Sequence, residues 1–400
     1  MIEPEFLPAA SAAAPDANMP AFPPSELDAR REALTAAMRR RGLDGLVVAV
    51  PENIYYLTSL DHWGFFACHA LLVPLDGPMV LVARAMERIT YENQVRNAGF
   101  IGFSDNGNPA DAIITGLKQL HLEGGRLGLE KNSLFLTARI AESLQEKTRA
   151  VTWIDASGLL DGIRLVQSPL EQAYTRRAAA AADAGTLAAI DAVHDGASDY
   201  EVAAECHHAM ILAGSEYPGF GPFIRPTRRL GEEHTTWRGD VFHHGDAAFL
   251  EIGAACRKYQ APMGRLVFVG TASDADHQAA ELAILGMAAI RDAVRPGATG
   301  SDVYQAWQDV ADEAGLGHYR RHHCGYLIGI GFPPSWTGGS MVTSLRPGST
   351  LELKPGMVFH LHSWFTNTGR GNYFVSNTAL LTERGCEILT HRTPQVLQVR

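Results

Sequence analysis

The spacing of apolar residues divides the chain into an alternating first part and a second part of helix pairs and strands. A helix is predicted to begin near Ser25 and to run through Arg41. Short apolar runs, which predict buried strands, lie at residues 43–50, 71–74, 79–83, 127–130 and 151–154. This alternation predicts an α/β domain over residues 25–165.

A strong helix start separates the two parts. Ser168 can cap a helix, Pro169 suits the first helical position, and Glu171 can complete a capping box. A second domain is therefore predicted over residues 166–400. Residues 1–24 are rich in Ala and Pro, and we expect them to form a disordered tail.

The second domain carries an internal repeat at an offset of about 100 residues. Asp191-Ala192-Val193 and Gly196-Ala197 recur as Asp292-Ala293-Val294 and Gly297-Ala298, and the potential caps Ser198 and Thr299 follow them. Strands are predicted after the two copies, at residues 247–254, 265–269, 357–364, 373–381 and 387–389. We expect a pseudo-two-fold α+β domain in which helices cover one face of a curved antiparallel sheet and the other face can hold a ligand.

Composition and charge limit the kinds of partner that we expect this chain to bind. The 400 residues are 46% hydrophobic and carry a formal net charge of −10, so they favour a folded chain that repels nucleic acid. No apolar stretch approaches the length of a membrane span, and residues 1–24 lack the basic start of a secretory signal. We therefore expect a cytoplasmic protein without membrane contact. The five Cys show no paired spacing and no common zinc motif occurs.

Glu251 is the most informative single residue, because it interrupts the apolar run of residues 247–255. A carboxylate in such a strand is costly unless it is paired. It could form a structural ion pair with Arg265 on the next strand, or it could serve as a nucleophile or general base. His234, shortly before this strand, could carry protons near neutral pH.

Further side chains suit a binding site, although each also has a structural explanation. His360 and His362 alternate along one predicted strand, so both face the same side, and a metal site there is a weak alternative. Trp63, Phe65 and Phe66 could be core residues, or they could form a wall against a flat cationic ligand.

Several stretches together resemble the pita-bread family of creatinase, Xaa-Pro peptidases and methionine aminopeptidases. The resemblance covers nearly the whole chain after residue 25. The stretches are Tyr217-Pro218, His234-x-Thr236-Trp237, Phe249-Leu250-Glu251-Ile252, Tyr259-x-Ala261-Pro262-Met263, Cys324-Gly325-Tyr326-x-Ile328-Gly329-Ile330, Pro333-Pro334-x-Trp336, Ser344-Leu345-Arg346-Pro347 and Gly356-Met357-x-Phe359-His360.

The resemblance also implies that the metal ligands of the peptidases are replaced. Their two Asp positions hold Glu251 and Pro262, their His position holds Ile328, and their two Glu positions fall at about His362 and Ser376. A two-metal site held by carboxylates cannot be built from this set. The similarity is greatest to the metal-free members creatinase and ectoine hydrolase, the latter of which opens a cyclic amidine.

The resemblance to this metal-free branch implies a hydrolase of a non-peptide C–N bond in a small amidine or guanidine, with no cofactor. It implies Glu251 as nucleophile or base and His234 as proton carrier. The residues expected to bind substrate are Tyr326, His323, His362, Arg265, Trp63, Phe65, Phe66 and Trp237. Creatinase-like enzymes are homodimers, so we expect a homodimer in which the three N-terminal aromatic residues could close a partner's pocket.

The chain departs from the ectoine hydrolase pattern at several positions. Gln260 stands in place of a His, Phe374 and Asn377 in place of acids, and His362 in place of an apolar residue. A different substrate is therefore an open alternative. Two other functions also remain open: a non-catalytic pita-bread module that binds a protein or peptide, and an Xaa-Pro-type metallopeptidase that uses His362 among altered ligands.

Overall fold

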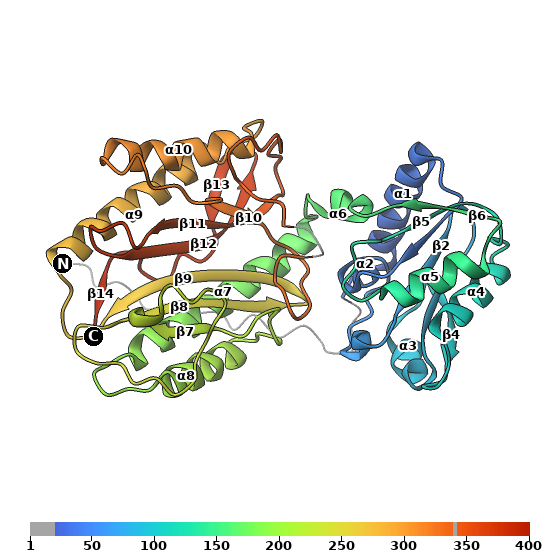
Figure 1. Cartoon of the computed structure of the whole chain (residues 1–400), viewed down its shortest axis with the longest axis horizontal. Coiled ribbons are helices and arrows are strands. Elements are labelled where there is room, and N and C mark those ends of the chain that lie inside the picture. Colours follow the sequence, from blue (N-terminus) through green and yellow to red (C-terminus); the bar gives the residue numbers. More distant parts are fainter. Residues whose placement is uncertain (1–20, 339–341) are drawn as a thin grey trace, which may run out of the picture.

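The computed structural model describes residues 21–338 and 342–400, which form two domains lying side by side (Figure 1). The N-terminal domain, on the right of the figure, is a mixed sheet flanked by helices. Its helices are α1 (Pro24–Arg41), α2 (Pro51–Thr58), α3 (Arg88–Gln94), α4 (Pro109–Gln119), α5 (Ala138–Lys147) and α6 (Leu159–Arg164). Its strands are β1 (Gly45–Val48), β2 (Ala70–Pro74), β3 (Met79–Arg84), β4 (Ala98–Phe103), β5 (Gly125–Leu129) and β6 (Val151–Asp155), in the order β4-β3-β2-β1-β5-β6.

The C-terminal domain is a curved sheet with two helix pairs. The helices are α7 (Pro169–Ala192), α8 (Asp199–Leu212), α9 (Asp274–Ala293) and α10 (Gly300–Glu313). The strands are β7 (Phe223–Pro226), β8 (Ala247–Cys256), β9 (Tyr259–Phe268), β10 (Gly325–Leu327), β11 (Val358–Phe365), β12 (Tyr373–Thr382), β13 (Gly385–Ile388) and β14 (Gln398–Val399). The main path runs β10-β11-β12-β9-β8-β7 with antiparallel neighbours.

The order of strands reflects the internal repeat. Each half of the domain contributes an edge strand, a middle strand and an inner strand, and the two inner strands β9 and β12 pair at the centre. Helix α7 packs on β8 and β9, whereas α9 packs on β11 and β12. The expected pseudo-two-fold α+β arrangement, with helices on one face of the sheet, is therefore confirmed.

The predicted helix starts are also confirmed. Ser168, Ser198 and Thr299 each accept a hydrogen bond from the backbone N–H three residues on. The acidic side chain at that position in turn accepts a hydrogen bond from the backbone N–H of the cap. These capping boxes satisfy two backbone donors apiece, which fixes where α7, α8 and α10 begin.

The last residues of the predicted tail, residues 1–24, are packed into the fold. Residues 1–20 lie outside the described residues, but Ala21 and Phe22 are buried, with Phe22 only 1% exposed. The Phe22 ring packs edge-on against Tyr55, Tyr174 and Tyr259, with centroids 5.7–6.2 Å apart. The ordered chain therefore begins before residue 25, because both domains provide a socket for this ring.

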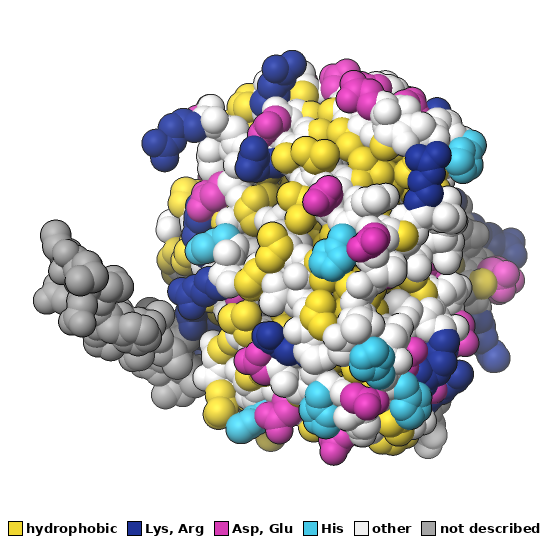
Figure 2. All heavy atoms as spheres, turned by 90° about the vertical axis from the view of Figure 1, so that its left-hand side faces the viewer, with side chains coloured by type: hydrophobic (Ala, Val, Ile, Leu, Met, Phe, Trp, Pro, Cys, Tyr) yellow, Lys and Arg dark blue, Asp and Glu magenta, His cyan; other side chains and the backbone are white. Residues whose placement is uncertain are grey.

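Two observations concern the surface and the membrane. The end of the C-terminal domain that faces the viewer in Figure 2 mixes acidic, basic and histidine side chains, and its described residues form no continuous basic surface.

Within the described parts of the chain, no helix combines the length and the apolar character that crossing a membrane requires.

Candidate active site

One row of residues crosses five neighbouring strands on the face of the sheet that the helices leave open. The cross-strand pairs Phe223–Glu251, Glu251–Gly264, Gly264–Ser376 and Ser376–His362 connect β7, β8, β9, β12 and β11 in turn. Directly opposed residues share a face. The neighbours of Glu251 in β8 point the other way, into the apolar core under α7 and α8.

A chain of hydrogen bonds lies beside this row. The indole N–H of Trp336 donates to the Tyr326 hydroxyl at 2.9 Å, and that hydroxyl lies 2.9 Å from His360 Nδ1. His360 Nδ1 is also 2.8 Å from His362 Nε2, and His360 Nε2 is 2.8 Å from Ser376 Oγ. The two imidazoles are thereby held in fixed orientations on the floor of the sheet.

A cavity of about 600 Å³ lies above these residues. Its walls combine aromatic rings, histidines, one arginine and two carboxylates. The lining residues are Phe220, Phe223, Glu233, His234, Glu251, Arg321, His322, His323, Tyr326, Ser335, Trp336, Thr337, Val342, Ser344, His362 and Trp364. Glu251, His234, Tyr326, His323 and His362, all singled out from the sequence, thus come together. The volume suits a small molecule.

Glu251 has an unusual electrostatic position. Burial raises the pKa of its carboxyl to about 7, opposed mainly by the charge of Arg225. Among the described residues, Glu251 accepts no hydrogen bond and forms no ion pair. Arg225 donates instead to the carbonyls of Arg229 and Thr235 and lies over the Phe249 ring. The acid is therefore left available on the cavity floor.

The groups around Glu251 stay uncharged near neutral pH. Burial, then the neighbouring His322, lowers the pKa of His323 to about 3. Burial and adjacent imidazoles hold the pKa values of His360 and His362 well below the usual range. Burial, then the charge of Glu251, raises the pKa of Tyr326 well above 10. The cavity floor thus holds neutral donors and acceptors around one acid.

His234 reaches the cavity from the loop before β8. Its backbone adopts φ 54°, a left-handed conformation that costs a residue with a Cβ about 1 kcal/mol. Its ring lies near Phe220 and Phe223, with centroids 6.5 and 6.0 Å away. A strained residue at a cavity edge is typical of a functional position.

Arg265 does not take the place expected from the sequence, and its ion pair with Glu251 does not form. The register pairs Arg265 with Leu250, so its side chain lies on the opposite face from Glu251. Its guanidinium donates to Asn377 Oδ1 and to the carbonyls of Gly264, Ser376, Thr393 and Pro394. Arg265 therefore anchors the C-terminal segment to the sheet.

Trp237 also lies away from the cavity lining. It is half-buried against the core under α7 and α8, and its ring meets His207 edge-on at 5.8 Å. In the same domain, Arg321, Phe220, Phe223, Trp336 and Trp364 line the cavity without having been assigned to the site from the sequence. Trp336 belongs to a quoted motif, whereas the others carry no local signal.

The three N-terminal aromatic residues do not line the cavity of their own chain. Phe65 is buried at the domain junction, where its ring meets Phe332 at 5.3 Å. Trp63 leans on Tyr217 at 4.2 Å and is 56% exposed, and Phe66 is 77% exposed.

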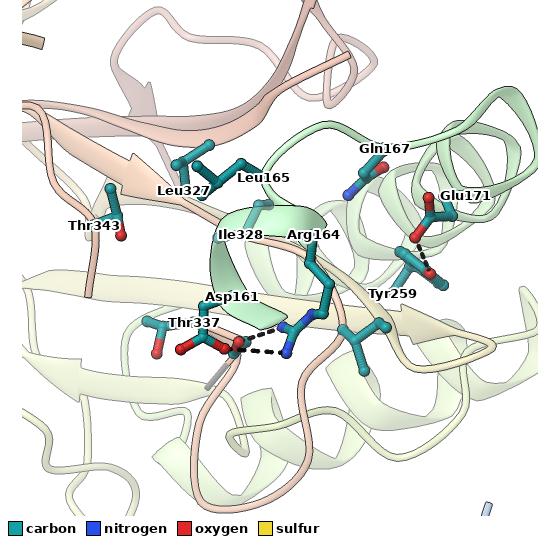
Figure 3. Close-up of a pocket in the computed structure, with 13 residues that line it drawn as sticks. Asp161, Arg164, Leu165, Gln167, Glu171, Tyr259, Leu327, Ile328, Thr337 and Thr343 are labelled. Carbon is teal, nitrogen blue, oxygen red and sulfur yellow. Dashed lines mark hydrogen bonds and ion pairs between the residues drawn. The ribbon is translucent and has the colours of Figure 1, made fainter. Parts of the chain in front are cut away.

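The positions that hold metal ligands in the resembling peptidases do not fit two ions here. Pro262 carries no donor side chain, and Ser376 offers only a hydroxyl that bonds to His360. Ile328 lines a separate hollow of about 40 Å³ near α6, beside the Arg164–Asp161 ion pair (Figure 3). A carboxylate-bridged pair of ions therefore lacks most of its donors.

Relatives of this chain include hydrolases of two kinds. The chain is 27% identical over 379 residues to ectoine hydrolase of Halomonas elongata, which covers 88% of this chain and 92% of that protein. It is 22% identical to an Xaa-Pro dipeptidase of Pyrococcus furiosus, covering 92% and 99%. The solved Xaa-Pro dipeptidase of Bacillus anthracis superposes with a TM-score of 0.81 at 21% identity, covering 94% of this chain and all of the other.

Two family models match adjoining segments. Residues 30–166 match the creatinase/prolidase N-terminal domain, and residues 173–383 match the metallopeptidase family M24. Together with the curved sheet and its two helix pairs, these matches identify the pita-bread fold. The chain is therefore a member of the metallopeptidase family M24, a family of hydrolases, with a creatinase-type N-terminal domain.

Proposed function

We propose that this protein hydrolyses a C–N bond in a small amidine- or guanidine-like compound, and that no metal ion takes part in the reaction. The observation that carries this proposal is that Glu251 and His234 line the same cavity. The Glu251 carboxylate among aromatic rings suits a flat cation, because aromatic faces and a carboxylate both attract one.

The chemistry can follow one of two routes. Glu251 can attack the electron-poor amidine carbon and form a C–O bond, after which the C–N bond breaks and His234 gives a proton to the leaving nitrogen. Water then attacks the substrate carbon bound to Glu251 and gives a proton to His234, and the C–O bond to Glu251 breaks, which restores the carboxylate. Alternatively, Glu251 takes a proton from water, whose oxygen attacks the same carbon, and the C–N bond then breaks as His234 gives a proton to the leaving nitrogen. In both routes Tyr326 and His323 orient the substrate.

The choice of a non-peptide bond rests on two supports. One is the similarity to ectoine hydrolase, and the other is the loss of donors at positions 262, 328 and 376. Xaa-Pro dipeptidases are also similar to this chain, so peptide cleavage is the competing activity that the experiment must include.

The test is a mass-spectrometric screen of ectoine, hydroxyectoine, creatine and an Xaa-Pro dipeptide, each with and without a chelator. We expect turnover of an amidine or guanidine that is lost in Glu251→Gln and His234→Ala. Cleavage of the dipeptide alone, and only without chelator, would contradict the proposal. Turnover of none, together with tight binding of a protein, would favour a binding module.

We further propose that the protein is a homodimer. The supporting observation is the exposure of Trp63 and Phe66 on one 3-10 turn of the N-terminal domain, where a second copy would shield them. Light scattering coupled to gel filtration should give twice the chain mass, and Phe66→Glu should reduce it toward the monomer. A wild-type protein of single-chain mass would refute this assembly.

A further inference from the structure

The floor of the cavity brings together three metal-binding side chains. One ligand atom each from Glu251, His360 and His362 lies within 4.8 Å of the other two. Two imidazoles and one carboxylate on one side of an ion, with the remaining positions open, form a common site for a divalent transition metal. We infer that this triad binds one such ion.

This set differs from the two-metal arrangement of the resembling peptidases. His360 is not at any of the five replaced ligand positions, and three of those positions carry no carboxylate or imidazole. The site would therefore hold a single ion. Such an ion would face the cavity beside Trp364 and Tyr326, where water or a small ligand could complete its coordination.

The orientation of His360 supports the assignment. Its Nε2 lies 2.8 Å from Ser376 Oγ, so that nitrogen can carry the proton and donate it to the hydroxyl. Nδ1 then presents its lone pair toward His362. Histidine ligands usually donate their second N–H to a neighbouring acceptor in this way, which fixes the tautomer and the ring.

The position of Glu251 is the second observation that supports the metal site. Its carboxylate comes from a different strand, stands on the cavity floor and has no hydrogen-bond or ion-pair partner among the described residues. Glu251 is partly withdrawn from water, where an acid without a partner is costly, and a bound cation would satisfy it.

The spacing of the nitrogens indicates the class of ion. His360 Nδ1 and His362 Nε2 are 2.8 Å apart. Two nitrogens at this spacing, each about 2.1 Å from an ion, subtend roughly 85° there. That angle matches neighbouring positions of a six-coordinate ion better than a tetrahedral one, so Co²⁺, Ni²⁺ and Fe²⁺ fit better than Zn²⁺. The ion must displace the hydrogen bond between Tyr326 and His360 and the one between His360 and His362.

One consequence rests on the proposed function. The ion would occupy the place beside Glu251 that the proposed reaction gives to a cationic substrate. Ion and substrate would therefore exclude each other, and added metal would inhibit competitively.

The test measures Co²⁺ binding to the metal-stripped full chain by equilibrium dialysis and visible absorption. We expect one Co²⁺ per chain, with the weak absorption typical of six-coordinate Co²⁺. Affinity should fall at least tenfold in His362→Gln, His360→Gln and Glu251→Gln. His234→Ala is the matched control, because it removes a cavity histidine outside the triad and should leave Co²⁺ affinity unchanged.

Further measurements distinguish a loss of metal binding from a failure to fold and from a loss of turnover. Circular dichroism shows whether each variant is folded, and Co²⁺ should raise the melting temperature of the wild type but not of folded His362→Gln. Stoichiometric binding that survives in folded His362→Gln, or no binding by the wild type, would overturn the site. Substrate turnover does not enter this measurement, so the metal site and the proposed reaction can fail independently.

Discussion

The two halves of the C-terminal domain share a scaffold but bring different chemistry to the cavity. Each half has a helix pair with a capped second helix and three strands in the same order. The first half supplies an acid, Glu251, and the second supplies the imidazoles His360 and His362. The comparison shows that the duplicated part of the molecule is its framework, whereas the site depends on individual side chains of the two middle strands, one on β8 and two on β11.

The largest expected effect comes from removing the acid of the first half. Glu251→Gln keeps the size of the side chain and removes its charge, so turnover of the amidine identified in the screen should fall about a thousandfold, within the range for such groups. Steady-state kinetics measure the loss, and circular dichroism should show an unchanged fold. Wild-type turnover in this variant would exclude both roles of Glu251.

The second largest effect on turnover is expected from His234, in the loop before β8. His234→Asn should lower turnover about a hundredfold, since the proton carrier is lost. Asn tolerates a left-handed backbone, so the melting temperature should stay close to that of the wild type. A large drop in melting temperature with normal turnover would mean that His234 serves the loop rather than the reaction.

A substitution at Gly264, where the two halves of the sheet pair, should lower the stability of the fold. A Cβ on Gly264 would come within 2.2 Å of the Phe374 ring, so Gly264→Ala should destabilise the fold by about 1–3 kcal/mol. Urea unfolding measures the change. Gly162→Ala is the matched control, because a Cβ there meets nothing within 4 Å and Ala favours its helix, so that variant should be neutral or stabilising.

The smallest expected effect comes from removing the helix caps, and it tests whether the two halves of the domain contribute equally to stability. Ser198→Ala and Thr299→Ala each remove one side-chain cap and should each cost about 1 kcal/mol. The caps start different helices, so the double variant should lose the sum of the two. Unequal losses in urea unfolding would show that the halves contribute differently to stability.

Local signals in the sequence were sufficient for the framework. The starts of α7, α8 and α10 depend on residues three positions apart, and the strands that face the helices follow from apolar runs. The strands β4, β7, β10 and β14 were not predicted. For β7 the reason is that Phe223–Pro226 is brief and ends in a proline.

Contacts between distant segments limited the prediction of the site. Glu251 could be singled out from its own strand, but its partner could not, since a shift of one residue in register decides whether Arg265 shares its face. Phe22 was likewise assigned to a tail, because the tyrosines around it come from three distant segments.

The pairing of Gly264 with Ser376 places the contributors to the site on opposite sides of a single seam. A chain divided between β9 and α9 would leave one fragment with the carboxylate and the other with both histidines. Neither fragment would carry a complete site, and Co²⁺ binding would return only when the two reassemble. Such a divided protein would report its own complementation through the colour of the bound ion.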